Sequence, residues 1–290
     1  MKTLLCVMAF LTAPFSAKAY KKIPKNFYEQ LTRQYYAPVP FKYDHAFCTD
    51  AVQAFFRFIA QPEDVKKKFN GKLSSNHRRG DLGLVYRHKT KGNEYSDKKC
   101  FFHYHPVLLK QHREAIEKNP VVKDFFTKAD ALWHEVYRQL QQVLLRLEKK
   151  HPGIYNSILK TKEPHIILRF LRYDIQTPGK LLAKPHFDAG AMTFAIAESK
   201  PGLRMGSGPD DLKLVTHHDK QALFFLAGNI SQLTNSGDLK PGWHDVVQVG
   251  EKSRNNQYER WAVVAFIDGH STTGAPESFT HKWRVSTHLL

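Results

Sequence analysis

The stretch Pro185-His186-Phe187-Asp188-Ala189-Gly190-Ala191-Met192-Thr193-Phe194 places an imidazole and a carboxylate two residues apart. In a β-strand, side chains two apart point to the same face, so His186 and Asp188 are expected to project together. Two histidines and one carboxylate bind one face of an iron(II) ion and leave the other positions open for oxygen and an organic ligand. A third ligand is therefore expected from a neighbouring strand, and His244 is the candidate.

The residues around this triplet are more specific than the triplet itself, since a second His-x-Asp occurs at His217-His218-Asp219. Gly190 and Thr193 follow the first triplet, and Pro201-Gly202-Leu203-Arg204 comes next. This pattern resembles the Fe(II)- and 2-oxoglutarate-dependent dioxygenases of the isopenicillin N synthase type. That family carries His-x-Asp-x-Gly-x-Leu-Thr and then a Gly-Leu pair at this point.

The candidate third ligand, His244, lies in a later segment that also resembles the family. Leu233-Thr234-Asn235-Ser236-Gly237-Asp238-Leu239-Lys240-Pro241-Gly242-Trp243-His244-Asp245-Val246-Val247 resembles the family's Thr-Asn-Gly…Lys-x-x-x-His-Arg-Val segment. The resemblance implies that His186, Asp188 and His244 bind Fe(II). Asp245 replaces the arginine that the family has beside its histidine.

The cosubstrate anchor implied by the resemblance is an arginine, whose planar fork pairs two-pronged with a carboxylate. The run Arg260-Trp261-Ala262-Val263-Val264-Ala265-Phe266 keeps the arginine and phenylalanine of the family's Arg-x-Ser…Phe motif but has Ala262 for the serine. Arg260 is therefore expected to hold the far carboxylate of 2-oxoglutarate, with Arg254 in a polar turn as the alternative. Tyr173 aligns with a family tyrosine that helps hold this cosubstrate.

A rival set of ligands has similar separations along the chain. It consists of His217, Asp219 and His270, with Arg284-Val285-Ser286 as an anchor that retains the serine. The glycine and threonine context is missing around Asp219, and Arg284 leaves only a short tail after it. We therefore favour the set around His186.

The periodicity of the rest of the chain predicts an α+β protein. Helices are expected from Thr49 or Asp50 to Ala60, from Glu63 to Phe69, and from Asn119-Pro120 to about Lys149. From His165 onward the chain shows short strands separated by turn residues, at 166–173, 192–197, 222–227, 243–249 and 261–267.

Such strands are typical of a sandwich or jelly roll, and the family's fold, a double-stranded β-helix, is one of these. We expect this core to carry N-terminal helices and one long scaffold helix. The expected division is a signal peptide over 1–19, an N-terminal helical and loop segment over 20–118, and the scaffold helix with the oxygenase-like jelly roll over 119–290. Residues 20–45 are expected to be an extended arm.

The first nineteen residues are typical of a secretory signal peptide. They contain Lys2, the apolar run 4–11 and the small-residue cleavage pattern Ala17-Lys18-Ala19. No later run reaches the ~18 apolar residues that span a bilayer. The mature protein is therefore expected to be exported, to the periplasm or the medium, without a transmembrane span. In an oxidising compartment Cys48 and Cys100 can pair, but two small buried residues are the default expectation.

The formal net charge of +17 attracts anions and nucleic acid. The basic residues are scattered, however, and no zinc-finger spacing, RNA-binding signature or basic helix is present. A solvated basic surface is thus favoured over nucleic-acid binding. A hydrophobic content of 42% indicates a globular protein with a sizeable core.

Together these features predict a non-haem Fe(II) dioxygenase that uses O2 and 2-oxoglutarate to hydroxylate, desaturate or cyclise an unknown small molecule. Two alternatives remain open. One is an isopenicillin N synthase-like oxidase that does not use 2-oxoglutarate, which Ala262 favours. The other is a non-catalytic secreted binding protein that keeps the jelly roll.

Overall fold

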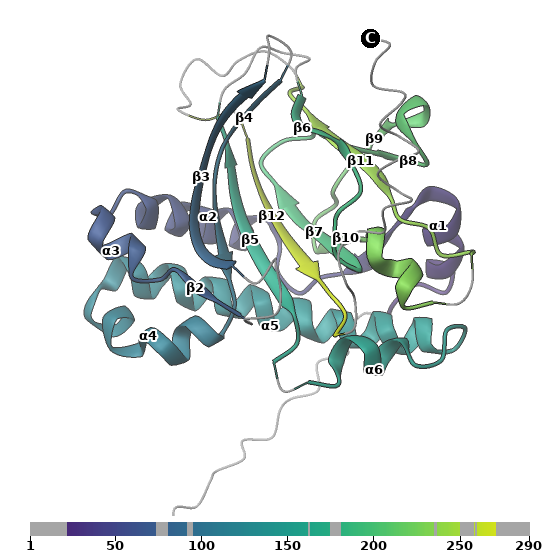
Figure 1. The fold of residues 1–290 in the computed structure, drawn as a ribbon, viewed down its shortest axis with the longest axis horizontal. Helices are drawn as coiled ribbons and strands as arrows, with labels where there is room; N and C mark the ends of the chain where they lie inside the picture. The colour runs from purple at the N-terminus through teal and green to yellow at the C-terminus, as the bar shows by residue number, and fades with distance from the viewer. Residues whose placement is uncertain are drawn as a thin grey trace, which may run out of the picture.

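A curved array of twelve mostly antiparallel strands dominates the computed structural model (Figure 1). The structure describes residues 22–73, 81–91, 95–161, 163–174, 181–234, 237–249, 258 and 260–270. The strands are β1 Tyr36–Pro40, β2 Gly71–Lys72, β3 Asp81–Lys91, β4 Tyr95–Tyr104, β5 Ile166–Tyr173, β6 Leu181–His186, β7 Met192–Glu198, β8 Leu203–Gly206, β9 Lys213–Leu214, β10 Gln221–Leu226, β11 Trp243–Val247 and β12 Arg260–Ile267.

The strands form two facing sheets joined at one edge. The major sheet has the order β1-β10-β7-β12-β5-β4, extended by β3 and β2, and the minor sheet has the order β6-β11-β8-β9. A single parallel pair, Tyr95 with Leu181, joins β4 to β6. The other pairs are antiparallel, and side chains from both sheets line one internal cavity. This arrangement is a double-stranded β-helix, so the predicted α+β fold with a jelly-roll core is confirmed.

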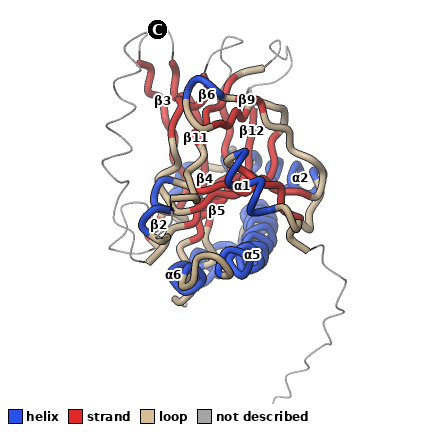
Figure 2. Tube along the Cα trace, turned by 90° about the vertical axis from the view of Figure 1, so that its right-hand side faces the viewer, coloured by secondary structure: helices blue, strands red, loops and turns tan. Residues whose placement is uncertain are grey.

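Helices cover the outer face of the major sheet. They are α1 Phe27–Gln34, α2 His45–Ile59, α3 Glu63–Lys67, α4 Val107–Lys118, α5 Pro120–Glu148 and α6 Ile154–Leu159. Two 3-10 turns, η1 Pro209–Asp211 and η2 Gly228–Gln232, lie in the connections between strands. Figure 2 shows α5 lying beneath β4 and β5. Trp133 of α5 donates its indole N–H to the carbonyl of Ile166 at 2.8 Å, which ties the helix to the sheet.

Strand alternation separates a helix-facing core from the cavity. In β12, Trp261, Val263, Ala265 and Ile267 belong to the core packed under the helices. The residues that alternate with them along the strand, Arg260, Ala262, Val264 and Phe266, line the cavity. Because successive side chains of a strand point to opposite faces, one apolar-looking run supplies both the scaffold and the site.

The N-terminal third differs most from the sequence expectation. Residues 20–45 contain α1 and the edge strand β1, where an extended arm was expected; β1 pairs with β10, and its Pro38 and Pro40 fit an edge position. The segment that follows α3 and β2 contains the long strand β3, which begins at Asp81 and pairs with β4. Helix α2 begins earlier than expected, since the side chain of Asp44 accepts a hydrogen bond from the amide of Phe47.

Other expectations concern cysteines and membranes. Cys48 and Cys100 are buried and not joined to each other. Among the described residues, no helix has both the length and the apolar character needed to cross a bilayer. The signal peptide expected at 1–19 lies outside the described residues.

A candidate metal centre and its cavity

His186 and His244 meet because their strands pair. They are register partners in the antiparallel pair β6–β11, and their ring centroids are 4.3 Å apart. Register partners project on the same side of a sheet, which aims both rings at one point. Asp188 follows the end of β6, with Oδ1 3.5 Å from Nε2 of His186 and 3.7 Å from Nε2 of His244. One ligand atom from each residue lies within 4.8 Å of the others, close enough to share an ion.

Both histidines are held in the tautomer that a metal ligand needs. Nδ1 of His186 lies 2.6 Å from the carbonyl of Lys184, and Nδ1 of His244 lies 3.1 Å from the carbonyl of Gly242. A carbonyl only accepts, so each Nδ1 carries the proton. Each Nε2 then has a lone pair available for a cation placed between the two rings and Asp188, which suits a neutral imidazole ligand.

Asp188 supplies the negative charge of the centre. Burial raises its pKa, but the neighbouring His244 and His186 and a 2.8 Å hydrogen bond from Oγ1 of Thr193 outweigh burial and hold the pKa well below its usual range. The hydrogen bond occupies Oδ2 and leaves Oδ1 facing the histidines. Thr193 of the sequence motif thus orients the carboxylate.

The turn after Asp188 is fixed by backbone contacts. The amide of Gly228 donates to the carbonyl of Asp188 at 2.7 Å, and the amide of Asn229 donates to the carbonyl of Gly190 at 2.9 Å. A Cβ at Gly190 would lie 2.6 Å from the carbonyl oxygen of Ile267 at the end of β12. Glycine is required there because the two backbones approach too closely for a side chain.

The rival ligand set is not brought together. Within the part of the chain that the structure describes, His186, Asp188 and His244 are the one group of His, Cys, Asp or Glu side chains placed to share an ion. Nδ1 of His217 instead lies 3.1 Å from Glu198, and Asp219 accepts the amide of His45. Arg284 and Ser286 lie outside the described residues.

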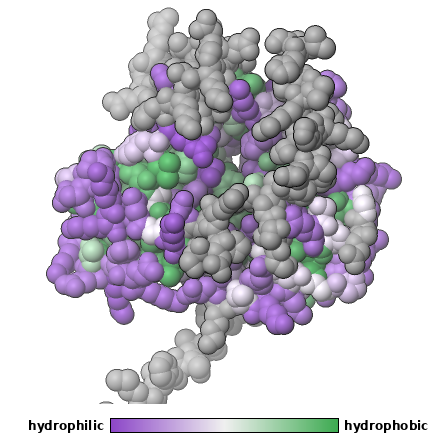
Figure 3. Space-filling model, viewed as in Figure 1, coloured by the Kyte–Doolittle hydropathy of each residue, from purple (hydrophilic) through white to green (hydrophobic). Residues whose placement is uncertain are grey.

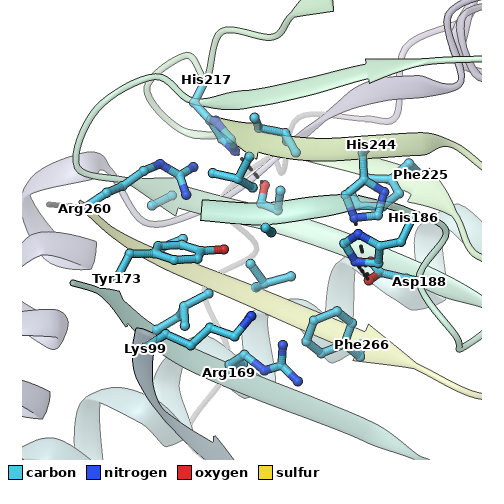
Figure 4. Close-up of a pocket in the computed structure, with 18 residues that line it drawn as sticks. Lys99, Arg169, Tyr173, His186, Asp188, His217, Phe225, His244, Arg260 and Phe266 are labelled. Carbon is cyan, nitrogen blue, oxygen red and sulfur yellow. Dashed lines mark hydrogen bonds and ion pairs between the residues drawn. The ribbon is translucent and has the colours of Figure 1, made fainter. Parts of the chain in front are cut away.

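The centre opens into a cavity of about 90 Å³ between the two sheets (Figure 4). Its apolar wall comes from both sheets, and five further polar or charged side chains line it: Lys99, Arg169, Tyr173, His217 and Arg260. Figure 4 shows Arg260 and Tyr173 at the end of the cavity away from the histidine pair. The structure therefore places both predicted cosubstrate residues in the same cavity as the predicted metal ligands.

Arg260 and Tyr173 are register partners on β12 and β5, with the guanidinium carbon 5.6 Å from the tyrosine ring centroid. Arg260 is buried and its Nε donates to the carbonyl of Lys200 at 3.1 Å. Ala262, where the family has serine, lines the cavity two residues further along. The alternative anchor Arg254 lies outside the described residues.

Glu198 is a site residue that the sequence analysis missed. It ends β7, is 6% exposed, and forms an ion pair with Nη2 of Arg260. Burial raises its pKa, but His217 and Arg260 outweigh burial, so the pKa is lowered and the carboxylate is charged. The available signal was an acid at the end of the otherwise apolar run 192–197, which is costly to bury without a cation.

Arg169 is the second missed residue, and it is held rigidly. Its guanidinium carbon lies 4.5 Å from the ring centroid of Phe101 and 4.4 Å from that of Phe266. Its Nε donates to Nε2 of His103 at 2.8 Å. Burial, followed by the charge of Arg169, lowers the pKa of His103 to about 3, so this histidine is neutral and accepts the bond. Cation–π stacking and this bond fix a positive group on the cavity wall.

Comparison with known proteins gives a fold and no close relative. No protein-family model matches the chain, and no curated protein matches it. Among solved structures, the chain is similar to a 2OG-Fe(II) oxygenase family protein from Caulobacter crescentus, with a TM-score of 0.62, 16% identity, and coverage of 90% of this chain and 92% of that one.

Two further solved structures have the same fold. The dioxygenase for auxin oxidation 1 from Arabidopsis thaliana, in a binary complex with 2-oxoglutarate, has a TM-score of 0.63 at 16% identity and covers 88% of this chain and 91% of its own. JOX2, in complex with 2-oxoglutarate, iron and JA, has a TM-score of 0.63 at 18% identity, with 87% and 73% covered. At these identities the likeness shows a shared fold.

Proposed function

Because the chain has the fold of the 2-oxoglutarate-Fe(II) oxygenases, we propose that it is a non-haem Fe(II)- and 2-oxoglutarate-dependent dioxygenase that oxidises a small molecule. One observation carries the proposal: two imidazole Nε2 atoms and one carboxylate oxygen converge at the edge of the cavity between the two sheets. This donor set suits Fe(II), because it holds one face of the ion and leaves the other face toward the cavity.

The protein's own groups have separate tasks in this proposal. His186, Asp188 and His244 hold the ion, and Arg260 with Tyr173 orients the far carboxylate of 2-oxoglutarate. When bound, Fe(II) and 2-oxoglutarate together supply the oxidising chemistry, in which O2 is consumed and 2-oxoglutarate becomes succinate and CO2. The apolar part of the cavity wall would shield the substrate position from side reactions with water.

Asp188→Ala tests the metal centre. We expect Fe(II) affinity to fall at least about 100-fold, because the variant loses the one anionic ligand and leaves two neutral ones. Conversion of 2-oxoglutarate to succinate should disappear with it. Calorimetric titration of metal under anaerobic conditions measures the affinity, and chromatography measures succinate.

The second His-x-Asp triplet supplies the matched control. Asp219→Ala removes a carboxylate in the same local sequence pattern but away from the ligand group. It should bind Fe(II) like the unchanged protein. Equal iron affinity in the Asp188 variant and the unchanged protein would contradict the proposed centre.

A second candidate is an oxidase of the same fold that uses no 2-oxoglutarate. It is favoured by Ala262, which lacks the family's hydroxyl, and by the pairing of Arg260 with Glu198. Iron-loaded protein that binds no 2-oxoglutarate and forms no succinate would support this candidate over the first. A secreted binding protein without catalysis would bind no iron in the same titration.

We also propose that the protein is exported. The support is the sequence of residues 1–19, with its basic start, apolar run and small-residue cleavage pattern. The expected mature chain begins at Tyr20. Mass spectrometry of protein recovered from the periplasm or medium of a secreting host would detect this end, whereas an intact chain retained in the cytosol would contradict export.

A further inference from the structure

At the end of the cavity away from the metal centre, Arg260 and His217 line the wall, and Glu198 lies buried against both of them. Arg260 is 3% exposed and Glu198 is 6% exposed. Nη2 of Arg260 contacts Oε2 of Glu198, and Nδ1 of His217 lies 3.1 Å from Oε1. Both oxygens of the carboxylate thus face a partner inside the protein.

His217 approaches Glu198 through one of its two ring nitrogens. Nε2 of His217 lies 3.2 Å from the carbonyl of Ala195, which only accepts, so this nitrogen carries hydrogen. Nδ1 is the ring nitrogen that faces Oε1 of Glu198, so the carboxylate lies between the imidazole of His217 and the guanidinium of Arg260.

This cluster changes what Arg260 offers to a ligand. Of its donors, Nε is used by the carbonyl of Lys200 and Nη2 by Glu198. A ligand carboxylate must share the guanidinium with a carboxylate already present, and two like charges close together in a buried site oppose each other. Glu198 is also the register partner of Ala262, the position where the family's serine hydroxyl is missing. The extra carboxylate and the missing hydroxyl thus lie side by side in the sheet.

We propose that Glu198 is a specificity-determining residue. Its carboxylate weakens the attraction of Arg260 for the distal carboxylate of a 2-oxoacid, and so lowers the preference of the site for dicarboxylic over monocarboxylic 2-oxoacids. The inference rests on the proposed function, because it assumes that a 2-oxoacid binds at the metal centre.

Two ligands that differ only in the distal carboxylate test this directly: 2-oxoglutarate and 2-oxovalerate. Protein loaded with Mn(II), which binds such sites without turnover, is titrated with each ligand by calorimetry. In Glu198→Gln, affinity for 2-oxoglutarate should rise on the order of tenfold or more, while affinity for 2-oxovalerate should change less than about twofold. The change in the ratio of the two Kd values is the diagnostic quantity.

Glu135 of α5 provides the matched control. It is also a buried glutamate paired with an arginine, but its partner Arg138, at 2.5 Å, does not line the cavity as Arg260 does. Glu135→Gln should leave the ratio unchanged. If Glu198→Gln does not fold, Glu198→Asp retains the charge on a shorter side chain that withdraws from Arg260, and the ratio should shift in the same direction by a smaller factor.

The outcomes separate this inference from the proposed function. Bound Mn(II) with an unchanged ratio, or with weaker 2-oxoglutarate binding in the variant, means that Glu198 only positions Arg260, and the inference is overturned. Failure of the unchanged protein to bind Mn(II) overturns the metal centre itself, and this inference falls with it. The inference on Glu198 is supported most strongly by two results together. The unchanged protein binds 2-oxovalerate as tightly as 2-oxoglutarate, and Glu198→Gln favours 2-oxoglutarate.

Discussion

The individual side chains of the candidate site are oriented by hydrogen bonds to neighbouring groups that are not themselves ligands. His186 and His244 each donate Nδ1–H to a backbone carbonyl two residues earlier in the chain, and Thr193 turns one oxygen of Asp188 away from them. Arg260 is oriented in the same way, by Glu198 and by a backbone carbonyl. Metal and anion sites depend on such supporting contacts nearly as much as on the ligands.

At this scale the missing hydroxyl of Ala262 can be restored. Ala262→Ser should tighten 2-oxoglutarate binding to the Mn(II)-loaded protein about two- to tenfold, because one hydrogen bond contributes roughly 0.5–1.5 kcal/mol net. Calorimetry measures the change. Val264→Thr, which adds a hydroxyl on the same face of β12 nearer the metal centre, is the control and should not tighten binding. Weaker binding in Ala262→Ser would show that position 262 does not face the bound carboxylate.

Among the elements, α5 is the longest described helix and has a well-defined start. Oδ1 of Asn119 accepts the amides of Val121 and Val122 at 3.0 and 3.2 Å, and Pro120 occupies the first turn. Its apolar stripe packs on the sheet, where the ring of Phe125 lies 5.0 Å from that of Phe170. The helix thus supports the strand that carries Arg169 and Tyr173.

Removing the cap should cost stability without touching the site. Asn119→Ala leaves two amide donors unsatisfied and is expected to lower the free energy of unfolding by about 1 kcal/mol. Asn119→Asp keeps the accepting oxygen and should be close to neutral. Urea unfolding followed by circular dichroism compares the three proteins, and equal midpoints for all of them would exclude a capping role.

The turn between β6 and β7 links element geometry to the metal centre. In Gly190→Ala the new Cβ would lie 2.6 Å from the carbonyl oxygen of Ile267, so the turn carrying Asp188 must move. We expect a loss of about 1–3 kcal/mol in unfolding free energy and at least about tenfold weaker Fe(II) binding. Gly237→Ala, where nothing lies within 4 Å of the added atom, is the matched control. Iron binding that is unchanged in Gly190→Ala would contradict this account.

At the scale of the whole molecule, a hydrophilic surface encloses histidines whose pKa is lowered by burial. On the face seen in Figure 3, hydrophilic side chains cover the region of α3 and α4. Inside, burial lowers the pKa of His105 to about 4 and that of His103 to about 3. Both histidines are therefore neutral in the folded protein at pH values where they are charged in the unfolded chain.

The sign of the resulting pH dependence follows from proton counts. Below the ordinary value of 6.5, the unfolded chain binds a proton at His105 that the folded protein does not, so stability falls as pH decreases toward the folded pKa of about 4. Between about pH 7.5 and pH 5 this histidine should contribute a loss of about 1–2 kcal/mol. His105→Gln should reduce the loss by that amount in urea unfolding at the two pH values. An equally steep loss in the variant would mean that His105 does not titrate differently in the two states.

Local chemistry was enough to predict several features from the sequence. The two-residue spacing of His186 and Asp188, the cap and stripe of α5, and the strands from 166 onward all depend on neighbours close in the chain. The structure brings the predicted His244, Arg260 and Tyr173 into the same cavity as His186 and Asp188. Helix α1 and strand β1, within residues 27–40, were not predicted. The sequence of β1 is too short to show a strand pattern, and the strand forms only because it pairs with β10.

Only the tertiary structure decided which charges share the cavity. Glu198 meets Arg260 because β7 and β12 pair in one register, and Arg169 lies between Phe101 and Phe266 because β4, β5 and β12 are adjacent. Nothing in the local sequence specifies a partner some sixty residues away, since strand order and register are set by burial of the whole sheet. The candidate ligands His186, Asp188 and His244 could therefore be named from the chain and its family resemblance, whereas the balance of charges around Arg260 required the folded arrangement.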